Sequence, residues 1–116
     1  MERLTIYQKP TCTTCRKVFE LLQQSGVDFD AVDYYIDPIP KAKLKELLGK
    51  MGIRARDLLR TNEPIYKTLG LATGEQTEAE LIDLMSKHPD LIQRPIVEKG
   101  KKAVLTRPPE RLREVL

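Results

Sequence analysis

The sequence contains no tryptophan, a single histidine and only two cysteines, and aromatic residues make up 5% of its 116 residues. With so few aromatic side chains and no interleaving of basic and aromatic residues, we expect no stacking platform for nucleic acids. A zinc site is disfavoured, because His88 is the only histidine and a second cysteine pair is missing. The hydrophobic runs extend over only a few residues, so no membrane-spanning helix is predicted.

The excess of positive over negative charge is also small. The 20 basic and 17 acidic residues leave a net charge of +3, which is too small to argue for a nucleic-acid partner. The length predicts one domain. The first residues enter a predicted strand almost at once and leave no room for a signal peptide, so we expect a cytoplasmic protein. In that reducing compartment, cysteines more often have a functional than a structural role.

Both cysteines fall in the stretch Tyr7–Lys17. The preceding Leu4–Tyr7 is β-branched, aromatic or apolar, which predicts a short buried strand. The apolar positions that follow are spaced i, i+3, i+4 and i+7, as on one face of a helix: Cys15, Val18, Phe19 and Leu22. Gly26 then offers a C-cap. Cys12 should therefore lie where the strand ends and the helix begins.

This position has consequences for the chemistry of Cys12. The first N–H groups of a helix favour an anion and shift a cysteine toward its thiolate form, and Lys9 and Arg16 add positive charge nearby. Cys12 is thus a candidate nucleophile, and Cys15, one turn further on, could close a disulfide with it. The alternatives are two small buried hydrophobic residues or half of a zinc site. A CxxC pair between a strand and a helix favours thiol chemistry.

The rest of the chain predicts further strands and a helical block. Residues 29–35 suggest a second strand, parallel to the first in a right-handed βαβ unit. Several helices follow: one from Pro40 to about Gly52, two short ones over 55–59 and 65–69, and one that begins with a capping box at Thr77–Glu80.

The last part of the chain returns to β character. Residues 96–97 and 103–105 predict a hairpin. A final helix should begin after the Arg107-Pro108-Pro109 segment, with three apolar residues on its core face: Leu112, Val115 and Leu116.

A βαβ unit with CxxC after its first strand, followed by a ββα unit, resembles the thioredoxin fold. In that fold a cis-proline commonly opens the third strand, and Pro95 occupies the matching place. The resemblance implies an α/β thioredoxin-like fold with a four-stranded mixed sheet. Residues 1–36 and 91–116 would form its core and residues 37–90 a helical insertion, all within one domain of residues 1–116.

The insertion and the motifs around it resemble the glutaredoxin-type arsenate reductase family and its relatives, which include the Spx class of transcriptional regulators. The matching segments are Tyr7–Cys12, Asp57–Thr61, His88–Val97 and Arg107–Glu110. The resemblance covers nearly the whole chain. It implies reduction of arsenate to arsenite without a bound cofactor or metal. The electrons would come from a reducing thiol donor, either glutathione with glutaredoxin or thioredoxin.

The resemblance also implies roles for individual residues. The cysteine at the position of Cys12 attacks arsenate in this family, and arginines at the positions of Arg60, Arg94 and Arg107 bind the oxyanion. Guanidinium groups suit this task, because they hold tetrahedral, multiply charged anions through two parallel hydrogen bonds. The helix terminus beside Cys12 would add backbone donors.

The chain departs from the family pattern at two positions. Many of these reductases have a different residue in place of Cys15, and often a histidine in place of Gln8. Cys15 suggests internal resolution of the adduct or a redox switch. Two alternatives therefore remain: an Spx-like regulator that binds RNA polymerase, and a general thiol-disulfide oxidoreductase. Gly52 could match a glycine of the polymerase interface, but it equally suits a helix C-cap.

Overall fold

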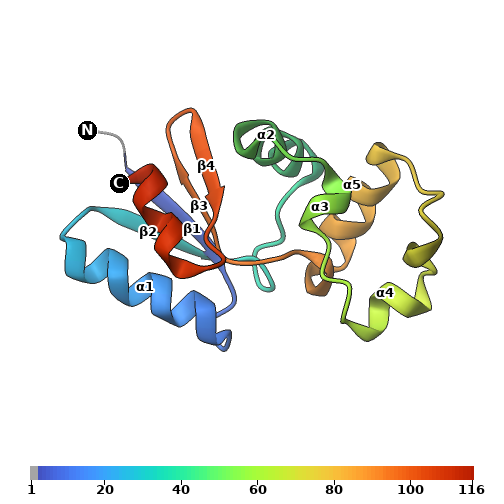
Figure 1. The fold of residues 1–116 in the computed structure, drawn as a ribbon, viewed down its shortest axis with the longest axis horizontal. Coiled ribbons are helices and arrows are strands. Elements are labelled where there is room, and N and C mark those ends of the chain that lie inside the picture. The colour runs from blue at the N-terminus through green and yellow to red at the C-terminus, as the bar shows by residue number, and fades with distance from the viewer. Residues whose placement is uncertain (1–2) are drawn as a thin grey trace. The chain divides into compact units, whose positions relative to one another are not determined.

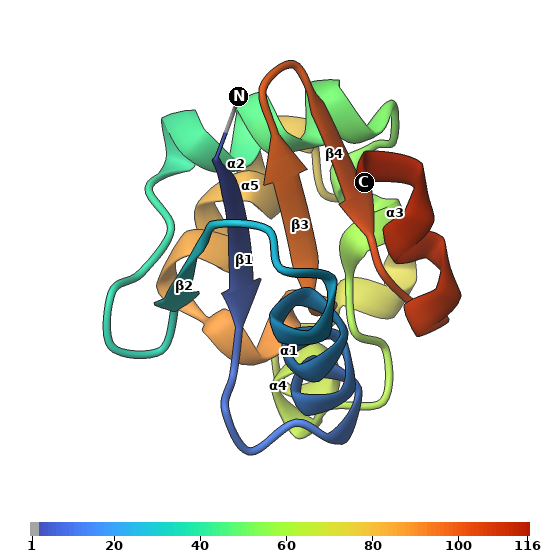
Figure 2. The ribbon, with the colours of Figure 1, turned by 90° about the vertical axis from the view of Figure 1, so that its left-hand side faces the viewer.

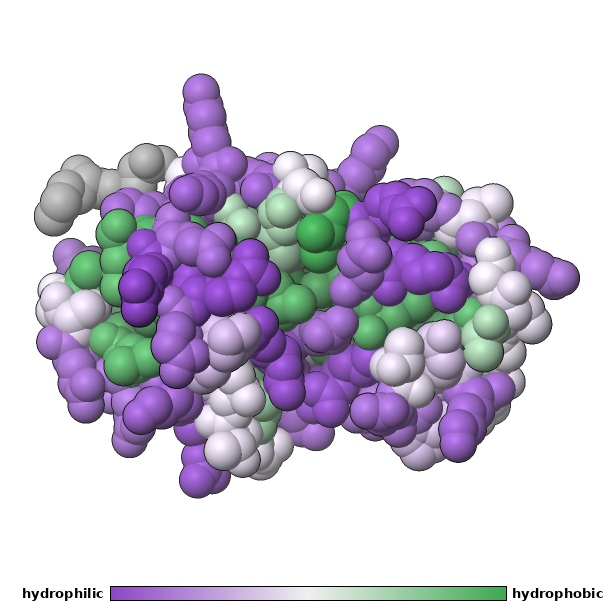
Figure 3. Space-filling view, in the orientation of Figure 1, coloured by the Kyte–Doolittle hydropathy of each residue, from purple (hydrophilic) through white to green (hydrophobic). Residues whose placement is uncertain are grey.

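The structure, a computed structural model, describes residues 3–116. The chain forms two compact units (Figure 1): the first comprises the residues up to Asp37 together with Arg94–Leu116, and the second is Pro38–Gln93. Hydrophilic residues predominate on the face shown in Figure 3, in line with a charged fraction of 32%. Within residues 3–116, no helix has the length and apolar character needed to cross a membrane.

The first unit is built on a four-stranded mixed sheet with the strand order β2-β1-β3-β4. Strand β1 (Leu4–Gln8) pairs in parallel with β2 (Phe29–Asp33) and antiparallel with β3 (Ile96–Lys99). Strand β4 (Lys102–Leu105) completes a hairpin with β3. The predicted α/β fold and mixed sheet are therefore confirmed. Because β1 is central and nearly fully buried, it fixes where the Cys12 loop leaves the sheet.

Two helices cover one face of this sheet (Figure 2): α1 (Thr13–Ser25) and the 3-10 helix η3 (Pro109–Val115). Since side chains alternate along a strand, every second residue of the strands faces these helices. The resulting core consists of buried aliphatic side chains: Leu4, Ile6, Val18, Leu22, Val97, Val104, Leu112 and Val115. This packing anchors α1 and therefore the position of its first turn.

Strand β2 ends at Asp33, two residues earlier than the sequence predicted. The Asp33 carboxylate accepts the backbone N–H of Tyr35 at 3.0 Å, and its carbonyl accepts those of Ile36 and Asp37 at 3.1 and 2.9 Å. Asp33 thus stabilises a tight turn that competes with extension of the strand. Tyr34 N–H still donates to the Gln8 carbonyl of β1 at 3.4 Å, but the chain turns at Tyr34 and Tyr35, although tyrosine favours strands.

The final helix also differs from the prediction. It is a 3-10 helix over Pro109–Val115, with Leu112 and Val115 buried. Leu116 was expected on the same face, yet 53% of it is exposed. A 3-10 helix has about three residues per turn, so positions i and i+3 share a face while the next residue turns away.

The second unit is helical. Its elements are α2 (Lys41–Met51), α3 (Ala55–Leu58), α4 (Pro64–Thr68), η1 (Leu71–Thr73), α5 (Glu78–Lys87) and η2 (Pro89–Leu91). The predicted capping box is present: Glu80 N–H donates to Thr77 Oγ1 at 3.1 Å, and Thr77 N–H donates to Glu80 Oε1 at 3.0 Å. Gly52 ends α2 with a φ of 68°, which explains why a glycine stands there.

A short antiparallel pairing within the second unit fixes the backbone beside Arg60. Leu59 and Ile92 form a β-bridge, and Arg60 N–H donates to the Leu91 carbonyl at 2.8 Å. The Gln93 side chain donates to the carbonyls of Asp57 and Leu59 at 3.1 and 3.2 Å. The Arg60 segment is therefore held to the residues that lead directly into Arg94.

Candidate active site

Cys12 is the N-cap residue of α1, as the sequence predicted. Its thiol sulfur accepts the backbone N–H of Cys15 at 3.3 Å, and its own N–H donates to the Lys9 carbonyl at 2.9 Å. Cys12 is half-buried, whereas Cys15 is completely buried on the inner face of α1. Cys12 is therefore the more accessible of the two thiols, and both thiols are free.

The two thiols differ in acidity. Partial burial disfavours the Cys12 thiolate, but hydrogen bonds with Cys15 and Arg94, together with the charge of Arg94, outweigh burial and hold the pKa of Cys12 below its usual value. Burial, and then the hydrogen bond with Cys12, raise the pKa of the Cys15 thiol to about 12. Cys12 is thus the more acidic thiol of the pair and the stronger candidate for the nucleophile, while Cys15 is protonated at neutral pH.

Arg94 is 6% exposed. Its Nη1 donates to the Tyr34 hydroxyl at 3.3 Å and to the Tyr35 hydroxyl at 3.0 Å. Its Nε is buried and has no hydrogen-bond partner within residues 3–116. A buried, unsatisfied donor of this kind calls for an explanation, and a bound anion would supply the missing acceptor.

The tyrosines were not predicted as site residues. Tyr34 is completely buried, and its ring lies 5.3 Å from that of Tyr35, centroid to centroid. Burial raises the pKa of the Tyr34 phenol, so the hydroxyl stays neutral. The Tyr35 ring carries Lys9 Nζ at 4.5 Å and Arg94 Cζ at 5.5 Å from its centroid. Tyr35 therefore contacts two cations at once.

Arg107 lies close to Arg94. Its Nη1 donates to the Arg94 carbonyl at 3.0 Å, while the residue as a whole is exposed. Pro95 is cis, as predicted, and its carbonyl accepts both the N–H and the hydroxyl of Thr106 at 3.0 Å. The bond between Arg107 and Pro108 is also cis, which the sequence analysis did not foresee. These contacts bring the start of β3 and the end of β4 together.

Arg60 belongs to the second unit and has a carboxylate partner there. Its Nε and Nη2 lie 3.1 and 3.0 Å from Glu63 Oε1. Both side chains are mostly buried, with relative exposures of 27% and 23%. An anion that binds Arg60 would therefore compete with Glu63.

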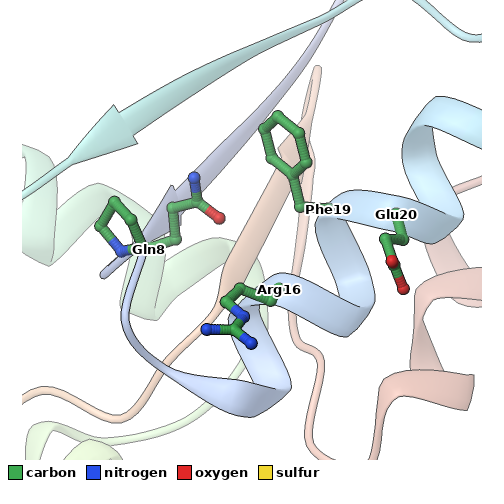
Figure 4. A pocket seen from close by; sticks show the side chains of 5 residues that line it. Gln8, Arg16, Phe19 and Glu20 are labelled. Carbon is green, nitrogen blue, oxygen red and sulfur yellow. The ribbon is translucent and has the colours of Figure 1, made fainter.

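A hollow of about 340 Å³ lies beside the first turns of α1 (Figure 4). Gln8 lines it from the end of β1 and Pro10 from the loop that follows, and Arg16, Phe19 and Glu20 line it from the helix. Gln8 is 7% exposed and cannot supply the positive charge that a histidine could bring to Cys12. The Cys12 thiolate depends instead on Arg94 and the helix terminus.

The site thus contains an acidic thiol at Cys12, a second thiol at Cys15 and a buried guanidinium at Arg94, whose Nε has no hydrogen-bond partner within residues 3–116. Such a set can bind a tetrahedral oxyanion and attack it through sulfur. Within residues 3–116, no group of three or more His, Cys, Asp and Glu side chains is placed to hold a metal ion.

Comparisons with known proteins identify the family of the chain. Residues 7–115 match the ArsC family. The chain is 40% identical over 116 residues to the arsenate reductase of Escherichia coli K12, covering 100% of this chain and 82% of that protein. It is 38% identical over 116 residues to the uncharacterized protein YfgD of the same strain, covering 99% and 98%. The solved arsenate reductase from Vibrio cholerae shares 32% identity, with a TM-score of 0.95 over 99% of this chain and 98% of that one. The family resemblance read from the motifs is confirmed, and the chain belongs to the ArsC family.

Proposed function

We propose that this protein reduces arsenate to arsenite in the cytoplasm at the expense of thiols, with Cys12 as the nucleophile. One observation carries the proposal: the half-buried Cys12 sulfur caps α1, and its pKa is lowered through contacts with Cys15 and the nearby Arg94. The names of two relatives, the arsenate reductases of Escherichia coli and Vibrio cholerae, support the choice of arsenate as the substrate.

The first step joins sulfur to arsenic. The Cys12 thiolate attacks arsenic(V), the S–As bond forms, and one oxygen leaves as water after it has taken up protons. Arsenic keeps its +5 oxidation state in this step. Positive charge around the oxyanion offsets its repulsion from the approaching thiolate and stabilises charge in the adduct.

The second step reduces arsenic. A second thiol attacks the Cys12 sulfur, the S–As bond breaks, and its electron pair goes to arsenic, which leaves as arsenite. The two sulfur atoms are joined in a disulfide. The balance over both steps is one arsenate and two thiols giving one arsenite, one disulfide and one water.

Cys15 is the candidate second thiol. Its backbone N–H lies 3.3 Å from the Cys12 sulfur, so the two residues are neighbours across the helix start. Its raised pKa means that Cys15 must lose its proton as it attacks. An external donor, either glutathione with glutaredoxin or thioredoxin, would then reduce the disulfide, or would itself supply the second thiol.

The arginines would hold the substrate. Arg94 is buried and retains an unsatisfied Nε, which supports a direct contact with an oxyanion oxygen. Arg107 is exposed and tied to the Arg94 carbonyl, which supports a role at the edge of the same site. The resemblance to the family supports Arg60 as a third ligand, and Arg60 would have to exchange Glu63 for the anion.

A second function, general thiol-disulfide exchange, is favoured by the same CxxC pair. Exchange on a neutral disulfide needs a low thiol pKa at Cys12 and a partner thiol, but no anion site. The unsatisfied donor of Arg94 has no task in that reaction, which is why we place arsenate reduction first.

An assay of arsenate reduction by the purified, pre-reduced protein tests the proposal. Arsenite is quantified with glutathione and glutaredoxin, with thioredoxin and its reductase, and with no added donor, and Cys12→Ser is the matched control. We expect catalytic turnover with at least one donor and none with Cys12→Ser. Disulfide exchange without arsenite formation under every condition would replace the proposal by its alternative.

A further inference from the structure

We propose that Tyr35 is a positioning residue: together with Tyr34 it holds the Arg94 guanidinium by one end, so that the opposite edge is presented to an oxyanion. The inference rests on the proposed function for its substrate, arsenate. It adds two aromatic side chains that the motifs did not indicate, and a specific orientation of the guanidinium.

The N–H groups of the Arg94 guanidinium are divided between the tyrosines and the edge that is open to an anion. Nη1 of an arginine carries two N–H bonds, and here it contacts two acceptors, Tyr34 Oη at 3.3 Å and Tyr35 Oη at 3.0 Å. Both N–H bonds of Nη1 are therefore engaged by the tyrosine hydroxyls. The Nε–H and one N–H of Nη2 point the same way and form the fork that binds two oxygens of one anion. Nε, the inner member of this fork, is the buried donor without a partner.

The tyrosines also preserve the positive charge of Arg94. A carboxylate could orient Arg94 equally well, but it would cancel the positive charge that an oxyanion needs. A phenol orients through its oxygen and stays neutral, and burial raises the pKa of Tyr34, so its hydroxyl does not ionise at neutral pH. The two tyrosines thus fix the guanidinium and leave its charge available.

Tyr35 also contacts a second cation, Lys9. The Tyr35 ring has Lys9 Nζ 4.5 Å from its centroid, and the Lys9 carbonyl accepts the N–H of Cys12 at 2.9 Å. The ring of Tyr35 therefore positions one cation while its hydroxyl positions another. Tyr35→Phe removes the hydroxyl and keeps the ring, whereas Tyr35→Leu removes both, so the two contributions can be separated.

A binding experiment isolates the effect from turnover. In Cys12→Ser protein, which cannot form the adduct, arsenate itself is titrated by calorimetry. Loss of one hydrogen bond to a charged group should weaken binding by about five- to tenfold in Tyr35→Phe. Tyr7→Phe is the matched control, because it also removes a buried tyrosine hydroxyl, one that donates to Glu98 Oε1 at 3.0 Å. We expect it to bind arsenate as the parent does.

A double-mutant cycle shows whether Tyr35 acts through Arg94. Tyr35→Phe should have no further effect on arsenate affinity in an Arg94→Ala background. Thermal melting of each variant verifies that it is folded, and Tyr34→Phe serves as a second test of the same anchor. Parent-like affinity in both Tyr35→Phe and Tyr34→Phe would overturn the inference, as would an equal loss with and without Arg94.

A last readout separates this inference from the proposed function. The pH midpoint of Cys12 alkylation needs no arsenate, and it should rise in Tyr35→Phe only when Arg94 is present. If that shift occurs in a protein that does not turn over arsenate, the positioning role stands and the proposed function fails. If turnover is normal while Tyr35→Phe changes neither the midpoint nor the arsenate affinity, the inference alone fails.

Discussion

Arg94 and Arg60 belong to different units of the chain, and each guanidinium is fixed by a different kind of partner. Arg94 is held by two tyrosine hydroxyls, and its buried Nε has no hydrogen-bond partner among residues 3–116. Arg60 is paired with the Glu63 carboxylate through two of its nitrogens. The positive charge of Arg94 is thus available to an anion, whereas the charge of Arg60 is balanced by a carboxylate.

Both units contain exposed ion pairs, which in the first unit join Arg3 to Asp30 and Arg111 to Glu114. The first unit also contains two thiols with shifted pKa values and a buried Nε of Arg94 that has no hydrogen-bond partner among residues 3–116. In the second unit, ion pairs and caps satisfy the polar groups: Lys41 with Asp83, Lys43 with Glu46, Lys87 with Asp83, and the Thr77–Glu80 capping box. Polar groups left unsatisfied at a stability cost mark the unit where we expect the chemistry.

The largest effect should come from removing the nucleophile. Cys12→Ser should abolish both arsenate reduction and disulfide exchange, because both reactions begin with attack by this sulfur. Steady-state assays of the two reactions provide the measurement. Cys15→Ser is the comparison variant and should retain the first attack on arsenate. Residual exchange above the uncatalysed rate in Cys12→Ser would show that Cys15 can act as a nucleophile by itself.

The two thiols should also differ strongly in their pH profiles. Alkylation requires the thiolate, so the rate rises with pH through the pKa of the thiol. Because the pKa of Cys12 is lowered, its midpoint should lie below that of a free cysteine; Cys15, with a pKa of about 12, should stay unlabelled at pH 7. We expect a rate ratio above about a hundredfold, since each pKa unit changes the thiolate fraction up to tenfold. Iodoacetamide labelling with peptide mass analysis measures both rates, and equal rates would contradict the assignment.

Oxidation should join the two cysteines within one chain. Their spacing across the start of α1 is that of a redox-active CxxC pair. Intact-mass measurement after mild oxidation should show the loss of two hydrogens and no dimer. The short loop should make the bond nearly neutral for the stability of the fold. A covalent dimer as the main product would point to a resolving thiol outside this chain.

The smallest effect should come from loosening the second unit. Thr77→Ala removes a side-chain cap of α5 and should lower the free energy of unfolding by about 1 kcal/mol. The alkylation midpoint of Cys12 should not move, because Thr77 belongs to the second unit, whereas Cys12, Cys15 and Arg94 belong to the first. Denaturant unfolding and the labelling assay together provide the measurement. A shifted midpoint would show that the acidity of Cys12 depends on the second unit.

The sequence predicted the parts of the site that are set locally. The strand Leu4–Gln8, the helix that follows and the N-cap position of Cys12 depend on neighbouring residues, and these predictions are confirmed. The cis bond at Pro95 was predicted from the resemblance to the thioredoxin fold, and it is present.

The contact between Arg94 and the tyrosines lay beyond sequence reasoning, because 60 and 59 residues separate the partners. The two adjacent tyrosines were assigned to a strand on their β propensity, whereas the Asp33 turn removes them from it. Propensity describes a residue in its local segment, and here a side-chain hydrogen bond in the turn and a distant guanidinium determine the outcome.

Arg94→Ala provides the most direct test of the central claim, which is that Cys12 and Arg94 form a site for reducing an oxyanion. Arsenate reduction and exchange on a neutral disulfide are measured side by side in the parent protein, Arg94→Ala and Arg94→Lys. We predict that Arg94→Ala slows arsenate reduction by about a hundred- to a thousandfold and slows disulfide exchange far less, because exchange loses only the contribution of Arg94 to the acidity of Cys12. Arg94→Lys should recover only part of the loss, because it keeps the charge without the fork. Arsenate reduction by Arg94→Ala at the parent rate would contradict the account.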